Sequence, residues 1–277
     1  MAENMRDGKF AHDCTSAPSE HRVLPLFSLA GRTAIVSGAG AGIGLAVAHA
    51  LAEAGANVAI WYNSNKEALT KASEIEQTYK VKCRAYQVNV TSWEAVESAV
   101  DRIVSEFGGR LDVFVANSGV AWEQGPMIDG GLDHYRKVTS TNVDGTFFCA
   151  RAAGKHFRRQ KREGTTVDGK TLQGFNQGSF IATASMSGHI ANIPQLQAAY
   201  NASKAAVIHL CKLVEMIKGE GEDKEADTKG DTGKSLGVEW AGFARANSVS
   251  PGYINTEISK FNSPEVRKVW ADKIPMG

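Results

Sequence analysis

The chain has 277 residues, of which 43% are hydrophobic, enough to bury the core of a single α/β domain. Its 31 basic and 30 acidic residues nearly balance, and no basic stripe is interleaved with aromatic residues, which argues against nucleic acid or an anionic membrane as a partner. The four cysteines and seven histidines lack metal-ligand spacing, so no metal site is expected. No apolar run is long enough to span a bilayer and no apolar signal core is present, so we expect a cytoplasmic protein.

Strand-like and helix-like patterns alternate along most of the chain. Residues 1–26 show no periodicity and are expected to form a flexible arm, followed by one domain over residues 27–277. Strands are expected at residues 33–36, 57–62, 83–90, 111–117, 179–183 and 244–249. Helices are expected at residues 45–55, 66–79, 92–107, 138–158 and 198–216. Repeated strand and helix predict a doubly wound parallel sheet of the Rossmann type.

Two polar stretches interrupt this alternation. Residues 162–177 are longer than an ordinary connection between a helix and a strand, and we expect a surface excursion there. Residues 213–234 are highly charged and lack aromatic residues, although they fall where a helix should finish. This second stretch is expected to be an unstructured insertion.

Closely spaced glycines separate the first expected strand from the first expected helix. Gly38, Gly42 and Gly44 follow the strand that begins at Thr33. Such a turn points the N–H groups of a helix N-terminus at an anion, and only glycine lets a pyrophosphate come that close. A plain strand-to-helix turn uses glycine in the same way, so the trio alone is weak evidence. The next strand, at residues 57–62, completes a βαβ unit and favours the phosphate site.

A phenol and an ammonium group are spaced four residues apart on the last long helix. At this spacing Tyr200 and Lys204 share one helix face. A nearby cation favours the phenolate, which would bring the pKa of Tyr200 closer to neutrality and suit proton transfer. On many helices the same pair is merely solvated. The strand ending near Ser185 brings a hydroxyl group to the carboxyl end of the sheet, where open α/β folds bind ligands.

In this order the motifs resemble those of the classical short-chain dehydrogenases/reductases. Within that family the chain is similar to the fungal NADP-dependent group of sorbose reductases, mannitol 2-dehydrogenases and carbonyl reductases. The resemblance covers residues 27–277 apart from the two insertions. The matching motifs are Ser37-Gly38-x-x-x-Gly42-x-Gly44, Asn117-Ser118-Gly119, Asn142, Ser185, Tyr200-x-x-x-Lys204 and Pro251-Gly252.

The resemblance implies reduction of a ketone by NADPH, the substrate being a ketose such as sorbose or fructose or a related small carbonyl compound. It implies that Tyr200 is the general acid and base and that Ser185 donates a hydrogen bond to the carbonyl oxygen. Lys204 would bind the nicotinamide ribose and lower the pKa of Tyr200, and Asn142 would seat a water molecule. Ser187 matches the commonest family spacing, whereas Ser185 matches the fungal group, and we select Ser185.

The resemblance also implies the residues that contact the cofactor. Two loop residues after the second strand indicate whether the cofactor is NAD or NADP. An NAD enzyme carries an acidic residue at this place, which would repel a 2′-phosphate, whereas this chain has Ser64 and Asn65. This favours NADP(H), although both residues could simply cap the following helix. The remaining expected contacts are Ser37, Gly38, Gly42, Ile43, Gly44, Asn89, Asn117, Tyr200, Lys204, Pro251, Gly252, Ile254 and Thr256.

Two departures from the family pattern affect the expectations. The family continues beyond the position of Gly277 into a helix and an edge strand, so a C-terminal edge element is expected to be missing. The insertion at residues 213–234 falls in a helix that pairs across a dimer interface in this family, and a dimer or tetramer is expected only if the insertion permits it. The alternatives are a dinucleotide-binding regulatory protein and an inactive truncated product on the same fold.

Overall fold

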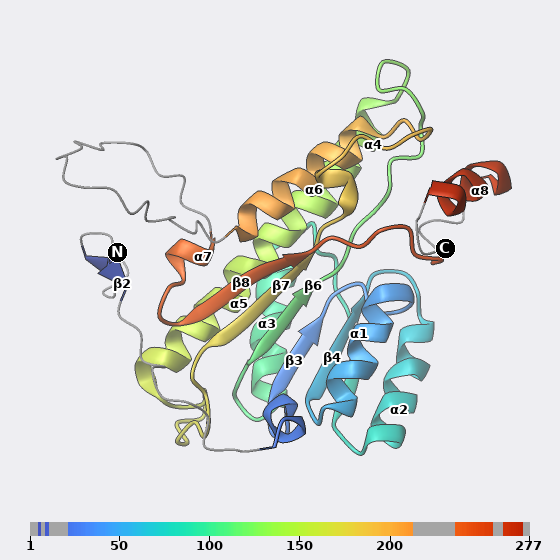
Figure 1. Cartoon of the computed structure of the whole chain (residues 1–277). Coiled ribbons are helices and arrows are strands. Elements are labelled where there is room, and N and C mark those ends of the chain that lie inside the picture. The colour runs from blue at the N-terminus through green and yellow to red at the C-terminus, as the bar shows by residue number, and fades with distance from the viewer. Residues whose placement is uncertain (1–4, 7–8, 11–21, 213–235, 257–262, 274–277) are drawn as a thin grey trace.

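The computed structural model describes residues 5–6, 9–10, 22–212, 236–256 and 263–273 (Figure 1). Its centre is a parallel sheet of six strands in the order β5-β4-β3-β6-β7-β8. The chain therefore leaves β3 toward one edge of the sheet and returns to the other side at β6, as in a doubly wound fold. The strands are β3 (Thr33–Val36), β4 (Asn57–Tyr62), β5 (Cys83–Gln87), β6 (Val113–Ala116), β7 (Gly178–Thr183) and β8 (Ala244–Val249).

Helices cover both faces of this sheet (Figure 1). The connections that return to the sheet carry α1 (Gly42–Glu53), α2 (Glu67–Tyr79), α3 (Trp93–Glu106), α5 (Gly145–Glu163) and α6 (Ala198–Cys211). Shorter helices are α4 (Leu132–Thr139), α7 (Leu236–Glu239) and α8 (Pro264–Lys273), with 3-10 turns η1 (Leu24–Phe27) and η3 (Met186–Gly188) and the π-helical segment η2 (Ser140–Asp144).

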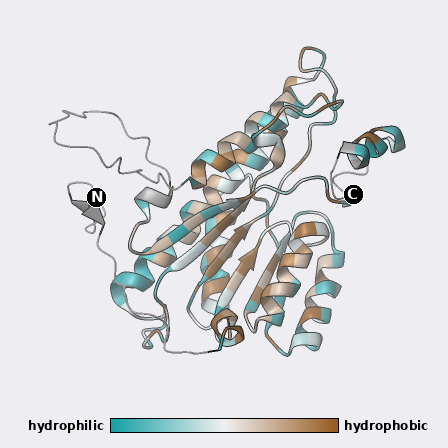
Figure 2. Ribbon diagram, in the orientation of Figure 1, coloured by the Kyte–Doolittle hydropathy of each residue, from teal (hydrophilic) through white to brown (hydrophobic). Residues whose placement is uncertain are grey.

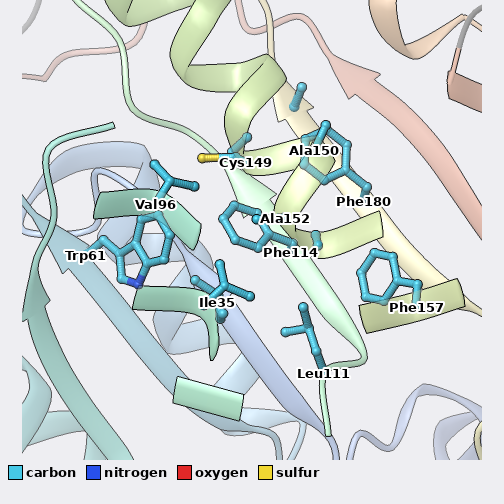
Figure 3. Packing of buried hydrophobic residues seen from close by; sticks show 14 of the residues in the cluster. Ile35, Trp61, Val96, Leu111, Phe114, Cys149, Ala150, Ala152, Phe157 and Phe180 are labelled. Atoms are coloured by element: carbon cyan, nitrogen blue, oxygen red, sulfur yellow. The ribbon is translucent and has the colours of Figure 1, made fainter. Parts of the chain in front are cut away.

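Alternate residues of the central strands face two different apolar layers. In β3, Ala34 and Val36 join the cluster beneath α1 and α2, whereas Ile35 joins the cluster beneath α3, α5 and α6. Trp61 and Phe114 extend the second cluster with an edge-to-face contact whose ring centroids are 5.4 Å apart (Figure 3). Burial on both faces explains the continuous apolar runs of these strands (Figure 2).

Polar groups anchor the amino end of the sheet. Asp112 is buried, with its carboxylate 3.1 Å from Arg32 Nη1 and 2.6 Å from Arg110 Nη2. The buried side chain of Gln160 on α5 accepts from the N–H of Leu111 and donates to the carbonyl of the same residue, both at 2.7 Å. These contacts fix the start of β6 against α5, and the site lies at the opposite end of the sheet.

The boundaries predicted for one helix and for the polar loop after it were wrong. The single helix expected at residues 138–158 consists of α4, η2 and α5, and α5 continues to Glu163, so the polar loop begins at Gly164 rather than at residue 162. That loop folds back through a Thr165–Thr171 bridge, and the N–H of Val167 donates to Gly109, which holds the loop against the amino end of the sheet. The helix expected at residues 198–216 is described only as far as Cys211.

The expected N-terminal arm contains short regular elements. Met5–Arg6 pairs with Lys9–Phe10 in an antiparallel bridge, and η1 precedes the first strand of the large sheet. The insertion expected at residues 213–234 lies outside the described residues. Across the described part of the chain, the helices are too short or too polar to cross a membrane.

Candidate active site

The glycine turn after β3 is shaped by close backbone approaches. Gly38 has φ +63°, and a Cβ there would lie 2.9 Å from the Cα of Ser118. A Cβ on Gly44 would lie 2.4 Å from the carbonyl oxygen of Gly38. Both positions therefore require glycine, which brings the start of α1 directly onto the end of β3.

The N-terminus of α1 is suited to an anionic ligand. Its N-cap residue, Ala41, has no side-chain oxygen and the helix start has no side-chain cap, so the first N–H groups remain available to a phosphate. The turn is tied to β6 because Ser37 Oγ accepts from the N–H groups of Asn117 and Ser118, both at 3.0 Å. Asn117 Nδ2 in turn donates to the carbonyl of Gly38 at 3.1 Å. These residues form the cradle that a pyrophosphate needs.

A serine and a tyrosine meet beside this cradle. Ser185 ends the segment after β7 and lines the same cavity as Tyr200 of α6, and its hydroxyl group lowers the pKa of the Tyr200 phenol. It also accepts from the N–H of Ser187 at 3.1 Å. The hydroxyl of Ser187 is occupied differently, because it accepts from Gln197 Nε2 at 3.0 Å. Of the two serines, Ser185 is the one whose hydroxyl group acts on Tyr200.

A buried lysine and a buried asparagine lie behind the tyrosine. Lys204 Nζ donates to the carbonyl of Thr183 at 2.7 Å and is 5.7 Å from the centre of the Tyr200 ring. Asn142 exchanges hydrogen bonds with the backbone of Val120 at 2.8 and 3.0 Å. A Cβ on Gly119 would contact both side chains, at 3.3 Å from Asn142 Oδ1 and 3.4 Å from Lys204 Nζ. Asn142 lies in η2, and π-helical turns of this kind often occur at functional sites.

Gly38, Asn117, Ser185, Tyr200 and Lys204 line one cavity of about 270 Å³ at the carboxyl end of the sheet. Its walls come from the glycine turn, the end of β6, the η3 segment, α6, the segment after β8, and α8. The expected residues that line it are Gly38, Gly42, Ile43, Asn117, Ser185, Tyr200, Lys204, Pro251, Gly252, Ile254 and Thr256. The cavity joins an anion-binding helix start to a proton-transfer group.

Comparisons with known proteins agree with this arrangement. A family model described as enoyl-(acyl carrier protein) reductase matches residues 38–215. L-xylulose reductase from Hypocrea jecorina is 63% identical over 273 residues, which cover 99% of this chain and 87% of that protein. Sorbose reductase from Candida albicans is 45% identical over 95% of this chain and 81% of its own length.

A solved structure shows the same fold. NADPH-dependent 3-quinuclidinone reductase from Rhodotorula rubra has a TM-score of 0.78 and 32% identity, over 96% of this chain and 86% of that one. The chain belongs to the short-chain dehydrogenase/reductase family. The resemblance noted in the sequence is thereby confirmed, as is the predicted doubly wound fold.

The pKa of Tyr200 differs from the expectation drawn from this family. Burial raises the pKa of Tyr200, while the hydrogen bond from Ser185 lowers it to a smaller extent. Lys204 is itself buried, and desolvation lowers its pKa from 10.5 to about 8. The predicted lowering of the Tyr200 pKa by Lys204 is therefore not what the structure shows, because Nζ is directed to the carbonyl of Thr183 rather than to the phenol.

Six expected residues lie outside the cavity lining of this short-chain dehydrogenase/reductase. Ser37, Gly44 and Asn142 stand behind the lining and shape it through the contacts given above. Ser64 is exposed. Asn65 caps α2 by accepting from the N–H of Glu67 at 3.0 Å and also donates to the carbonyl of Gly40 at 3.3 Å. Asn89 is exposed beyond β5, with its side chain bonded to Thr91.

Gln197, Tyr253 and Trp270 are among the lining residues that the sequence interpretation did not select. Tyr253 and Gln197 lie next to selected motifs, and their polar side chains could have been chosen on that ground. Trp270 comes from α8, which reaches the cavity only through tertiary packing. Its ring stacks on Tyr253 with centroids 3.9 Å apart, a contact that no sequence spacing indicates.

Proposed function

We propose that this protein reduces a small polyhydroxylated ketone, such as xylulose, sorbose or fructose, to the corresponding polyol. The chain is an NADP-dependent oxidoreductase that interconverts C=O and CH–OH groups. Support for a ketose comes from the relatives named L-xylulose reductase, sorbose reductase and NADP-dependent mannitol dehydrogenase. The observation that carries the proposal is that Ser185, Tyr200 and Lys204 line one cavity, which begins at the α1 N-terminus.

The cofactor would be held by groups already in place. The glycine turn and the first N–H groups of α1 would bind its pyrophosphate, and Lys204 lies where a ribose hydroxyl could meet its ammonium group. When bound, NADPH supplies the hydride for the reduction. The contact of Asn65 with the glycine turn and the absence of a carboxylate between residues 62 and 66 favour a 2′-phosphate over a bare ribose.

The protein's own side chains would handle the proton. With its pKa raised, Tyr200 keeps its proton at neutral pH and can donate it to the carbonyl oxygen of the substrate. Ser185 Oγ can donate a hydrogen bond to the same oxygen while negative charge develops there. The reverse reaction uses the same groups in the opposite order.

The test is an NADPH oxidation assay with xylulose, sorbose, fructose and 2,3-butanedione, on the wild type and Tyr200→Phe. We expect turnover of at least one ketose and a loss of about 10²–10⁴-fold in kcat for Tyr200→Phe, with NADPH binding retained. Tyr135→Phe is the matched control, because Tyr135 is exposed on α4 and lies outside the cavity lining. NADPH binding without turnover of any carbonyl compound would instead support a dinucleotide-binding regulatory protein.

A further inference from the structure

Tyr253 is a polar residue in the cavity wall that the proposed mechanism does not use. It follows the Pro251–Gly252 turn and lines the same cavity as Ser185 and Tyr200. A tyrosine in such a wall offers an apolar ring and one hydroxyl group. The hydroxyl group is the part of Tyr253 that can form a hydrogen bond with a substrate.

A chain of buried amide groups orients the Tyr253 hydroxyl. Asn192 Nδ2 donates to it at 3.0 Å, and Gln197 Nε2 donates to Asn192 Oδ1 at 2.7 Å. The same Gln197 nitrogen donates to Ser187 at 3.0 Å, so the chain is anchored beside the catalytic serine. Because Asn192 fills an acceptor position of Tyr253, the phenolic hydrogen remains for another acceptor, and the described part of the protein supplies none.

Trp270 holds the Tyr253 ring in this wall. Its ring is parallel to that of Tyr253, with an interplanar angle of 8°, and its side chain is buried. Its Nε1 is buried too, so the polar atom of Trp270 is not open to the cavity. The Tyr253 hydroxyl group is therefore the member of this stacked pair with a hydrogen left for a ligand.

We propose that Tyr253 is a specificity-determining residue whose hydroxyl group binds a substrate hydroxyl next to the carbonyl. This inference rests on the proposed function and names the part of the ketose that the site recognises. The stacked Tyr253 and Trp270 rings hold α8 against the cavity, and the Tyr253 hydroxyl group favours a substrate with hydroxyl groups over a plain ketone. A site built for a hydroxyl group discriminates against an analogue that lacks it, because its own polar group is then left unpaired.

The experiment compares Tyr253→Phe with the wild type on two kinds of substrate. One is the ketose with the highest wild-type kcat/KM, and the other is 2,3-butanedione, which has carbonyl groups and no hydroxyl. The variant keeps the ring that stacks on Trp270 and removes only the hydroxyl group. We expect kcat/KM for the ketose to fall about tenfold, mainly through KM, while the value for 2,3-butanedione stays within about twofold.

Controls separate recognition from folding and from the proposed function. Tyr135→Phe should change neither value, because Tyr135 is exposed and lies outside the cavity lining. The melting temperature measured in the presence of NADPH should be the same for Tyr253→Phe and the wild type. An equal loss on both substrates, or no loss on the ketose, overturns the role of Tyr253 alone. A wild type that reduces 2,3-butanedione but no ketose overturns the proposed function, and this inference with it.

Discussion

The two serines after β7 differ in what their hydroxyl groups contact. The Ser185 hydroxyl group lowers the pKa of Tyr200, whereas the Ser187 hydroxyl group accepts from Gln197. Ser185→Ala should therefore lower kcat by about 10²-fold, because it removes a donor that acts on the developing oxyanion. Ser187→Ala should cost less than tenfold and should act mainly on KM through the Gln197 chain. Steady-state kinetics of both variants check this, and the reverse order would assign the oxyanion donor to Ser187.

Burial of Lys204 should be visible in stability as well as in activity. The change in its pKa from 10.5 to about 8 corresponds to roughly 3 kcal/mol at 1.36 kcal/mol per unit, as an upper bound. Below about pH 8 the native state bears this whole cost. Between about pH 8 and 10.5 the unfolded state still holds the proton that the native state has lost, so the free energy of unfolding rises with pH.

Lys204→Met should accordingly be more stable than the wild type at pH 7 in the absence of cofactor, and this advantage should shrink as the pH approaches 10.5. The loss of the bond to Thr183 reduces the gain to about 2 kcal/mol. Urea unfolding at several pH values measures the difference in unfolding free energy between variant and wild type. Lys137→Met, on the exposed face of α4, is the control. If the difference in unfolding free energy between Lys204→Met and the wild type did not depend on pH, burial of the Lys204 charge would not destabilise the native state.

At the scale of elements, the side chain of Gln160 hydrogen-bonds α5 to the backbone at the start of β6. Gln160→Leu would leave the N–H and carbonyl of Leu111 without their 2.7 Å partners inside the protein. We expect a loss of about 2–4 kcal/mol in unfolding free energy, with kcat nearly unchanged because the site is at the other end of the sheet. Gln87→Leu is the control, since Gln87 is exposed and donates only to the Asn63 carbonyl. Equal melting temperatures for the two variants would contradict this role.

The elements and the site were predictable to different degrees. The strands could be predicted from apolar runs such as residues 113–116, and the turn could be predicted from the glycines at positions 38 and 44. Both follow from local sterics and burial. The direction of the Tyr200 pKa was not predictable, since it depends on how deeply the packed elements bury the phenol. The same holds for Trp270, whose place at the cavity depends on where α8 packs. Local patterns carry no information about such distant contacts.

At the scale of the whole molecule, the cofactor site joins the two halves of the sheet. Groups from the β3 turn, the end of β6, α6 and the segment after β8 line one cavity, so a ligand bound there stabilises both halves together. The expected dimer or tetramer stays a prediction, to be measured by light scattering. Binding to the native state alone stabilises a protein by about 2.7 kcal/mol when the ligand is at one hundred times its Kd.

Stabilisation of the native state by a bound cofactor tests the role of the loop after β4. At equal concentrations NADPH should raise the melting temperature of the wild type more than NADH, by several degrees, because the exposed loop at Ser64 carries no negative charge to repel a 2′-phosphate. Ser64→Asp places a carboxylate near that phosphate, and after screening by solvent and salt the repulsion should amount to about 1–3 kcal/mol, a loss of roughly ten- to hundredfold in NADPH affinity.

The same carboxylate can accept hydrogen bonds from the ribose hydroxyl groups of NADH. The rise in melting temperature caused by NADH should therefore stay the same or become larger in Ser64→Asp, and the advantage of NADPH over NADH should shrink or reverse. Ser64→Asn is the matched control, because it changes the side chain at the same position without adding charge. A wild type that NADH stabilises more than NADPH would contradict the assignment of this loop to the 2′-phosphate, while the roles of Ser185 and Tyr200 would be unaffected because neither residue belongs to this loop.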